Sequence, residues 1–90
     1  MPMHGVNYDL RKPGRAYGPL IEAIKSLGAW AHVAESSWIV STDLTDAEIR
    51  DALLPHIDVN DVLIVTALTG SWASYGLNEE LVGWLNEATV

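Results

Sequence analysis

The sequence predicts an α+β fold in which two helices cover one face of a four-stranded antiparallel sheet. Segments with strand-like composition and segments with helical spacing alternate in the order β-α-β-β-α-β, and a short C-terminal helix follows. Each half of this order is a βαβ unit, and two such units form the split-βαβ, or ferredoxin-like, arrangement. Right-handed crossovers then place both main helices on the same face of the sheet.

The first strand and the first helix are bounded by loop-forming residues. A strand is expected over residues 4–9, ended by the loop sequence Arg11-Lys12-Pro13-Gly14. A helix is expected over residues 19–28, because Pro19 suits a first helical position and apolar residues follow at helical spacing. Gly28 is expected to be its stop.

The middle of the chain predicts a pair of strands and a capped helix. Residues 30–35 and 38–42 have strand composition, and Ser36-Ser37 between them indicates a tight connection or a bulge. Thr45 and Glu48 have the spacing of a capping box, which predicts where the second helix begins. Its apolar stripe is expected to consist of Ile49, Ala52 and Leu53.

The last third predicts a turn, the strongest strand and a final helix. Pro55 limits the second helix, and residues 58–61 have the composition of a turn. Residues 62–68 are expected to form a strand closed by Gly70. Asn78-Glu79-Glu80 opens a helix with acids in its first turn. The residues expected on one face of that helix are Leu81, Trp84 and Leu85.

Composition narrows the class of protein. Ninety residues, 49% hydrophobic and 19% charged, indicate one small domain over residues 1–70 with a C-terminal extension over 71–90. Five basic against twelve acidic residues give a net charge of −7, which argues against a basic coat for bulk nucleic-acid binding. The absence of cysteine excludes disulfides, Cys-ligated zinc and thiol catalysis. With no membrane-length apolar run and no signal peptide, a cytoplasmic protein without membrane contact is expected.

The strand over residues 62–68 is apolar on both faces. Leu63 and Val65 point to one side, and Ile64 and Leu68 point to the other. Helices on one face leave the second apolar set uncovered, so a homodimer is expected to cover it. The alternative cover is the C-terminal extension, packed on its own domain or exchanged with a partner subunit.

Asp9 is the candidate metal-binding and catalytic residue. It ends the first strand, where a carboxylate can face solvent or a metal. One carboxylate is too little to hold Mg²⁺, but a two-fold dimer supplies two. The alternative is an ordinary turn residue, because aspartate is common where strands end.

Three of the five basic residues lie within five positions beside Asp9: Arg11, Lys12 and Arg15. This local reversal of sign suits a phosphate backbone held next to a metal, which makes these three the candidate nucleic-acid-binding residues. The alternative is a solvated basic loop that neutralises an acidic body.

The remaining chemistry-bearing residues point to structural roles. The histidines at 4, 32 and 56 match no metal motif and fall on separate elements. The serines at 36, 37 and 41 lack the context of a hydrolase nucleophile, and no nucleotide-binding glycine motif occurs. The four tryptophans at 30, 38, 72 and 84 can stack bases when exposed, but no strand alternates basic and aromatic residues. Core or interface packing is therefore expected for them.

Several segments over about residues 4–69 carry a family resemblance. They are Asn7-Tyr8-Asp9-Leu10, Lys12-Pro13-Gly14, Tyr17, residues 20–30, Glu35-Ser36-Ser37-Trp38, Ala47-Glu48-Ile49-Arg50 and residues 60–65. They resemble small bacterial and phage proteins labelled SinR-like, which look like relatives of CRISPR-associated protein 2 and of the virulence-associated protein D toxins. The resemblance implies a ferredoxin-like homodimer in which Tyr8-Asp9 matches the motif that supplies a metal-binding carboxylate.

Two functions follow as hypotheses. The first is a Mg²⁺- or Mn²⁺-dependent endoribonuclease, toxin-like, with Asp9 of each subunit on the metal and the basic loop on RNA. The second is a non-catalytic dimeric adaptor or scaffold, which binds a basic protein or a nucleic-acid partner. The acidic charge favours the adaptor, and the Tyr8-Asp9 match favours the nuclease. The sequence contains no helix-turn-helix pattern, so it does not indicate a role in transcription.

Overall fold

The computed structural model describes residues 2–11, 17–68, 73, 75–77 and 79–88. Its first four elements are β1 (Met3–Asp9), α1 (Gly18–Lys25), β2 (Ala29–Ala34) and β3 (Ser37–Ser41). They are followed by α2 (Asp46–Leu53), the short 3₁₀ helix η1 (Leu54–His56), β4 (Val62–Leu68) and α3 (Glu79–Ala88). The predicted element order is confirmed: β4 has the predicted bounds, and the ends of the other three strands differ from prediction by at most one residue.

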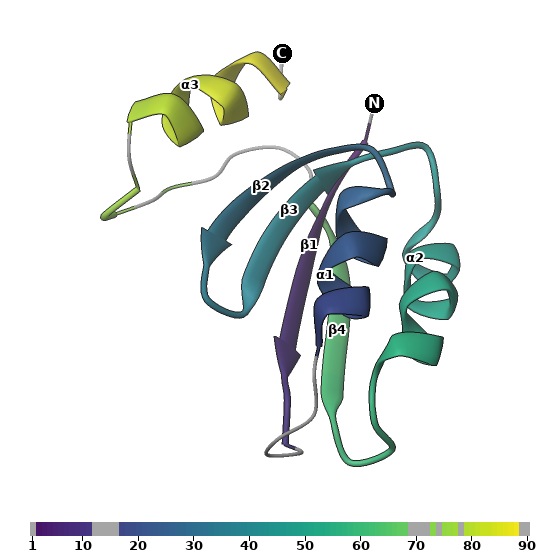
Figure 1. Ribbon diagram of the computed structural model, residues 1–90. Coiled ribbons are helices and arrows are strands. Elements are labelled where there is room, and N and C mark those ends of the chain that lie inside the picture. The colour runs from purple at the N-terminus through teal and green to yellow at the C-terminus, as the bar shows by residue number, and fades with distance from the viewer. Residues whose placement is uncertain (1, 12–16, 69–72, 74, 78, 89–90) are drawn as a thin grey trace.

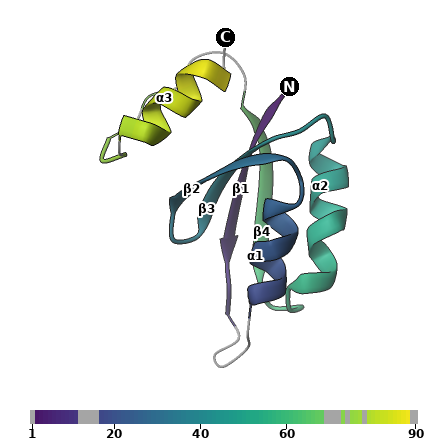
Figure 2. The same cartoon turned by 45° about the horizontal axis from the view of Figure 1, so that its top comes forward.

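The four strands form one sheet in the order β2-β3-β1-β4, and every neighbouring pair is antiparallel. Both α1 and α2 lie side by side against one face of this sheet (Figures 1 and 2). The chain is therefore an α+β protein whose sheet and helices are compatible with a ferredoxin-like fold. Strand β1 is one of the two interior strands, and its last residue, Asp9, is paired only with β4, because the pairing with β3 ends at Asn7.

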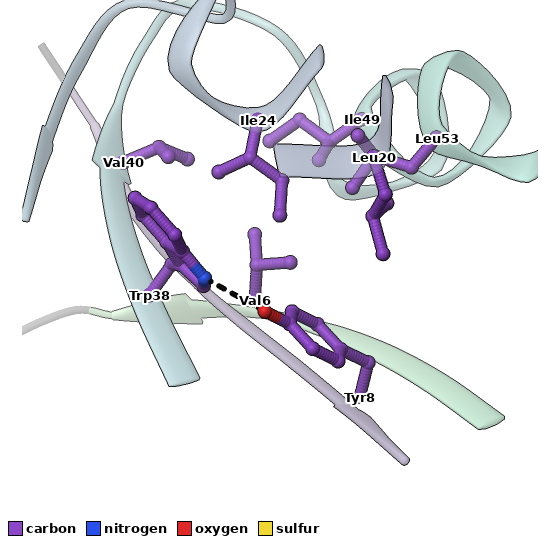
Figure 3. Close-up of a cluster of buried hydrophobic side chains, with 8 residues drawn as sticks. All are labelled: Val6, Tyr8, Leu20, Ile24, Trp38, Val40, Ile49 and Leu53. Atoms are coloured by element: carbon purple, nitrogen blue, oxygen red, sulfur yellow. Dashed lines mark hydrogen bonds between the residues drawn. The ribbon is translucent and has the colours of Figure 1, made fainter. Parts of the chain in front are cut away.

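The core lies between the sheet and the two helices. In β1, Val6 and Tyr8 point to the helix side. Val6 lies opposite Trp38 of β3 and Val65 of β4, its register partners. The buried cluster, drawn in Figure 3, consists of Val6, Tyr8, Leu20, Ile24, Trp38, Val40, Ile49 and Leu53. Burial of such large apolar side chains is the main favourable term for a domain of this size.

Helix α2 begins where the capping box predicts. The Thr45 side chain accepts a hydrogen bond from the Glu48 backbone N–H at 3.1 Å, and the Glu48 carboxylate accepts one from the Thr45 N–H at 2.9 Å. These two bonds satisfy donors that a helix start otherwise leaves free. Ile49 and Leu53 are buried, as expected, whereas Ala52 is exposed.

The prediction of a helix over residues 19–28 was wrong at its C-terminal end. Helix α1 ends at Lys25, and Gly28 does not have the positive φ angle of a glycine that terminates a helix. A glycine is required at position 28 for another reason. A Cβ atom at Gly28 would lie 2.2 Å from the backbone carbonyl oxygen of Ser41, so the close approach of β3 excludes a side chain there.

The face of the sheet opposite α1 and α2, here called the open face, is covered only in part. Met3 and Ala31 point to it and are buried, as is Leu85 of α3. Helix α3 lies apart from the other two helices, near the end of the sheet where β1 begins (Figures 1 and 2). Along β4 the open face stays exposed. No described helix is long and apolar enough to cross a membrane.

Candidate functional site at the end of β1

Asp9 is the last residue of β1 and lies opposite Val62 of β4. Side chains alternate along a strand, so Asp9 projects to the open face while Tyr8 projects into the core. Its side chain is 60% exposed. The predicted candidate carboxylate therefore lies at the surface, at the end of the interior strand β1 and on the face that α1 and α2 leave free.

Arg11 pairs with Asp9 within the same chain. Both Nε and Nη2 of its guanidinium lie 2.9 Å from Oδ2 of Asp9. Both side chains are exposed, and such pairs contribute about 0–1 kcal/mol to stability. The pair neutralises Asp9, and because it is weak, a competing ligand can separate it. The two other predicted basic residues, Lys12 and Arg15, lie outside the described residues.

Asp61, which the sequence indicated only as a turn residue, binds the described residues on either side of the β1–α1 connection. Its Oδ1 accepts a hydrogen bond of 2.7 Å from the backbone N–H of Arg11. Its Oδ2 accepts one of 2.8 Å from the Tyr17 hydroxyl and one of 2.7 Å from the backbone N–H of Asp58. One carboxylate thus ties both ends of the β1–α1 connection to the turn before β4. Three donors already engage it, so it is a positioning group.

A polar pair adjoins Asp9 on the open face. The Ser37 hydroxyl donates a hydrogen bond of 2.6 Å to Oδ1 of Asn7, and these residues are register partners in β3 and β1. Asn7 lies two positions before Asp9, so both point to the same side. Sequence reasoning missed this pair, because only the strand register brings residues 30 positions apart together.

The described residues of one chain do not make a metal centre. Among them, no group of three or more His, Cys, Asp and Glu side chains could hold a metal ion. The histidines occupy separate elements, as expected. His4 is buried with Nδ1 2.5 Å from Oδ1 of Asp46, His32 is on β2, and His56 is in η1. Among the described residues Asp9 has no second metal ligand beside it, so in the proposal developed below a second chain supplies one.

The tryptophans separate into different environments. Trp38 is 1% exposed and belongs to the core, as expected, whereas Trp30 on β2 is 43% exposed. Trp84 of α3 is half-buried, and Trp72 lies outside the described residues. Both Trp30 and Trp38 point to the helix side of the sheet, but α1 does not fully cover the edge strand β2.

Comparison with known family models and with solved structures found no match to this chain. The description of the site thus depends on its own geometry. That geometry consists of an exposed carboxylate at the end of the interior strand β1, its arginine partner, and an incompletely covered sheet face beside them.

Proposed function

We propose that the chain forms a homodimer through its open face and acts as a metal-dependent endoribonuclease. In this proposal, Asp9 from each protomer contributes to one site for Mg²⁺ or Mn²⁺. The observation that carries it is the position of Asp9 on the same face as the exposed apolar side chains of β4. In a two-fold interface built on this surface, a carboxylate meets its own copy when the axis passes close to it, and the proposal places the axis beside Asp9.

The apolar surface supports the dimer. Val62, Ile64 and Leu68 all point to the open face and are exposed, with Ile64 at 55%. Burying such side chains is worth on the order of 25 cal/mol per Å² of apolar surface, and a small domain gains more than a large one from an additional interface. Helix α3 lies near the end of the sheet where β1 begins, away from the end of β1 that carries Asp9 (Figure 1).

The donor chemistry supports a hard divalent cation. Mg²⁺ prefers carboxylate oxygens, takes few of them from protein and keeps several waters. When bound, such an ion polarises a phosphate and lowers the pKa of a water ligand. Within this chain, Arg11 would leave Oδ2 of Asp9 and donate to a phosphate oxygen of the RNA strand. The weakness of an exposed ion pair makes that exchange inexpensive.

The resemblance of Tyr8-Asp9 to the metal-binding motif of CRISPR-associated protein 2 supports the same residue. The similarity to virulence-associated protein D toxins supports RNA as substrate. In the described chain Tyr8 has a structural role: its hydroxyl accepts a hydrogen bond from the Trp38 indole in the core. The proposal therefore assigns the chemistry to Asp9 alone.

A second candidate is a non-catalytic dimeric adaptor for a basic protein partner. It is favoured by the net charge of −7 and by the guanidinium that already engages Asp9. An acidic surface accelerates association with a basic partner. In this case the open face still forms the dimer, and Asp9 needs no metal.

Cleavage of labelled single-stranded RNA distinguishes these candidates. The matched control for Asp9→Asn is Asp51→Asn, because Asp51 is similarly exposed and pairs with Arg50 at 3.0 Å. The proposal expects cleavage by the wild type and by Asp51→Asn in Mg²⁺ or Mn²⁺, and loss in Asp9→Asn or in chelator. Equal cleavage by all three proteins, or none by the wild type, would refute the nuclease.

A further inference from the structure

We propose that Lys25, Trp30 and His32 form a binding platform for an unpaired base of a single-stranded nucleic acid. We call these three residues the β2 platform. It lies at the edge strand β2 and the end of α1, on the helix side of the sheet. The proposal shares its ligand class with the proposed function but involves a different surface, because Asp9 projects from the open face at the end of β1.

The platform is aromatic, exposed and supported from below. Trp30 and His32 are two positions apart on β2 and so share one side of the strand. Both are exposed, while Trp38 beneath them is buried. The His32 ring stacks on Trp38 with centroids 3.9 Å apart and planes at 7°, and the Trp30 ring lies 5.4 Å from Trp38 at 59°.

This packing holds the exposed rings in place. The His32 Nε2 atom also lies 3.3 Å from the carbonyl oxygen of Glu35, at the β2–β3 turn. Rings fixed in this way lose little conformational freedom when a ligand stacks on them. Trp30 keeps 43% of its surface exposed, so part of its ring is accessible to a ligand.

Lys25 supplies the charge. Its Nζ lies 4.9 Å from the centroid of the Trp30 ring, within cation–π distance. The other two cations among the described Lys and Arg residues, Arg11 and Arg50, each pair with an aspartate. Lys25 has no carboxylate partner within the described part of the chain. In a chain of net charge −7, an unpaired cation on an exposed tryptophan favours an anionic ligand.

A base with its phosphate matches this combination. Base–aromatic stacking is the main sequence-tolerant contribution to single-strand binding, and a nearby cation binds the backbone phosphate. A basic peptide would be repelled by Lys25, and an apolar peptide would leave its charge unused. The strand chemistry common to RNA and DNA is therefore the ligand we assign.

Fluorescence anisotropy with short labelled RNA and DNA strands of equal sequence tests the β2 platform. The assay contains chelator, so cleavage cannot interfere. Trp30→Leu keeps the apolar cover of Trp38 but removes the stacking surface, and Trp30→Tyr restores an aromatic ring. Lys25→Gln removes the cation, and Arg50→Gln, an equal charge change on α2, is the control.

We expect Trp30→Leu to weaken binding by about tenfold or more, and Trp30→Tyr to recover most of it. Lys25→Gln should weaken binding and reduce its salt dependence by about one released ion, while Arg50→Gln behaves like the wild type. Similar changes with RNA and DNA support the shared ligand, and a change with RNA alone narrows it to RNA. Unfolding temperatures of all variants show whether each one folds.

Wild-type affinity in folded Trp30→Leu and Lys25→Gln, or no binding by the wild type, would overturn the platform. If Trp30→Leu does not fold, Lys25→Gln against Arg50→Gln decides the question. Failure of the nuclease is a separate result: binding that depends on Trp30, with no cleavage in metal, would retain the platform and reject catalysis by Asp9. Cleavage that depends on Asp9, with unchanged binding by Trp30→Leu, would do the reverse.

Discussion

The hydroxyl of Tyr8 accepts a hydrogen bond of 3.0 Å from the indole N–H of Trp38, and both side chains are buried (Figure 3). This bond joins β1 to β3 inside the core, one residue before Asp9. Tyr8→Phe leaves the buried indole donor without an acceptor, so we expect a loss of about 1–3 kcal/mol in the free energy of unfolding. Tyr75→Phe, at a fully exposed position, is the control and should change nothing. Equal urea midpoints for the two variants would contradict this.

The buried His4 depends on Asp46 for its hydrogen bond. Its Nδ1 faces the Asp46 carboxylate, and its Nε2 has no hydrogen-bond partner among the described residues. Asp46→Asn keeps an acceptor, whereas Asp46→Ala leaves the ring without one. Both variants lose the same charge in the first turn of α2, so that effect cancels. We expect Asp46→Ala to be less stable than Asp46→Asn by about 1–3 kcal/mol. Identical thermal unfolding of the two would show that the bond contributes nothing.

A substitution at Gly28 tests how closely β3 approaches the end of the α1–β2 connection. A Cβ there would meet the backbone carbonyl of Ser41, which cannot move as a flexible side chain can. Gly28→Ala should therefore cost about 1–3 kcal/mol of stability. Gly83→Ala in α3 has open space around the new methyl group, and its higher helix propensity should not lower stability. Chemical denaturation measures the free energy of unfolding of both variants. A Gly28→Ala variant as stable as the wild type would contradict the close approach of β3.

Local signals in the sequence were sufficient for most of the fold. The capping box of Thr45 and Glu48 acts over three residues, and the turn at 58–61 is closed by a hydrogen bond of 3.0 Å from the Asp61 N–H to the Asp58 carbonyl. Such interactions form between neighbours along the chain, so composition and spacing reveal them. The tight connection expected near Ser36-Ser37 is present as the two-residue turn 35–36 between β2 and β3. The register shift between these strands lies earlier, between His32 and Ala34, because it depends on how the strands pair.

The candidate site was predictable only where it is local. The place of Asp9 at a strand end and the adjacent Arg11 could be recognised from the sequence. The Asp61 carboxylate accepts hydrogen bonds from the Arg11 N–H and the Tyr17 hydroxyl, 50 and 44 positions away, and no spacing in the sequence signals them. The exposure of Trp30 beside the burial of Trp38 also depends on tertiary packing, because it is set by how far α1 reaches over β2.

The proposed dimer predicts a specific effect at Ile64. A lysine there should leave the fold intact, because the side chain is exposed in the single chain, but should place a charge in the apolar interface. Val59→Lys, at an exposed turn outside β4, is the control. Analytical ultracentrifugation should find monomers of Ile64→Lys and dimers of both Val59→Lys and the wild type. Dimers of all three proteins, or monomers of all three, would place the open face outside any interface.

The stoichiometry of Mn²⁺ binding tests most directly whether two copies of Asp9 share one metal site. Isothermal titration of the wild type should give one ion per two chains, because each protomer contributes one carboxylate. Asp9→Asn and Ile64→Lys should both lose this binding, and Asp51→Asn should retain it. One ion per chain, or binding that survives Asp9→Asn, would contradict the shared site at the end of β1.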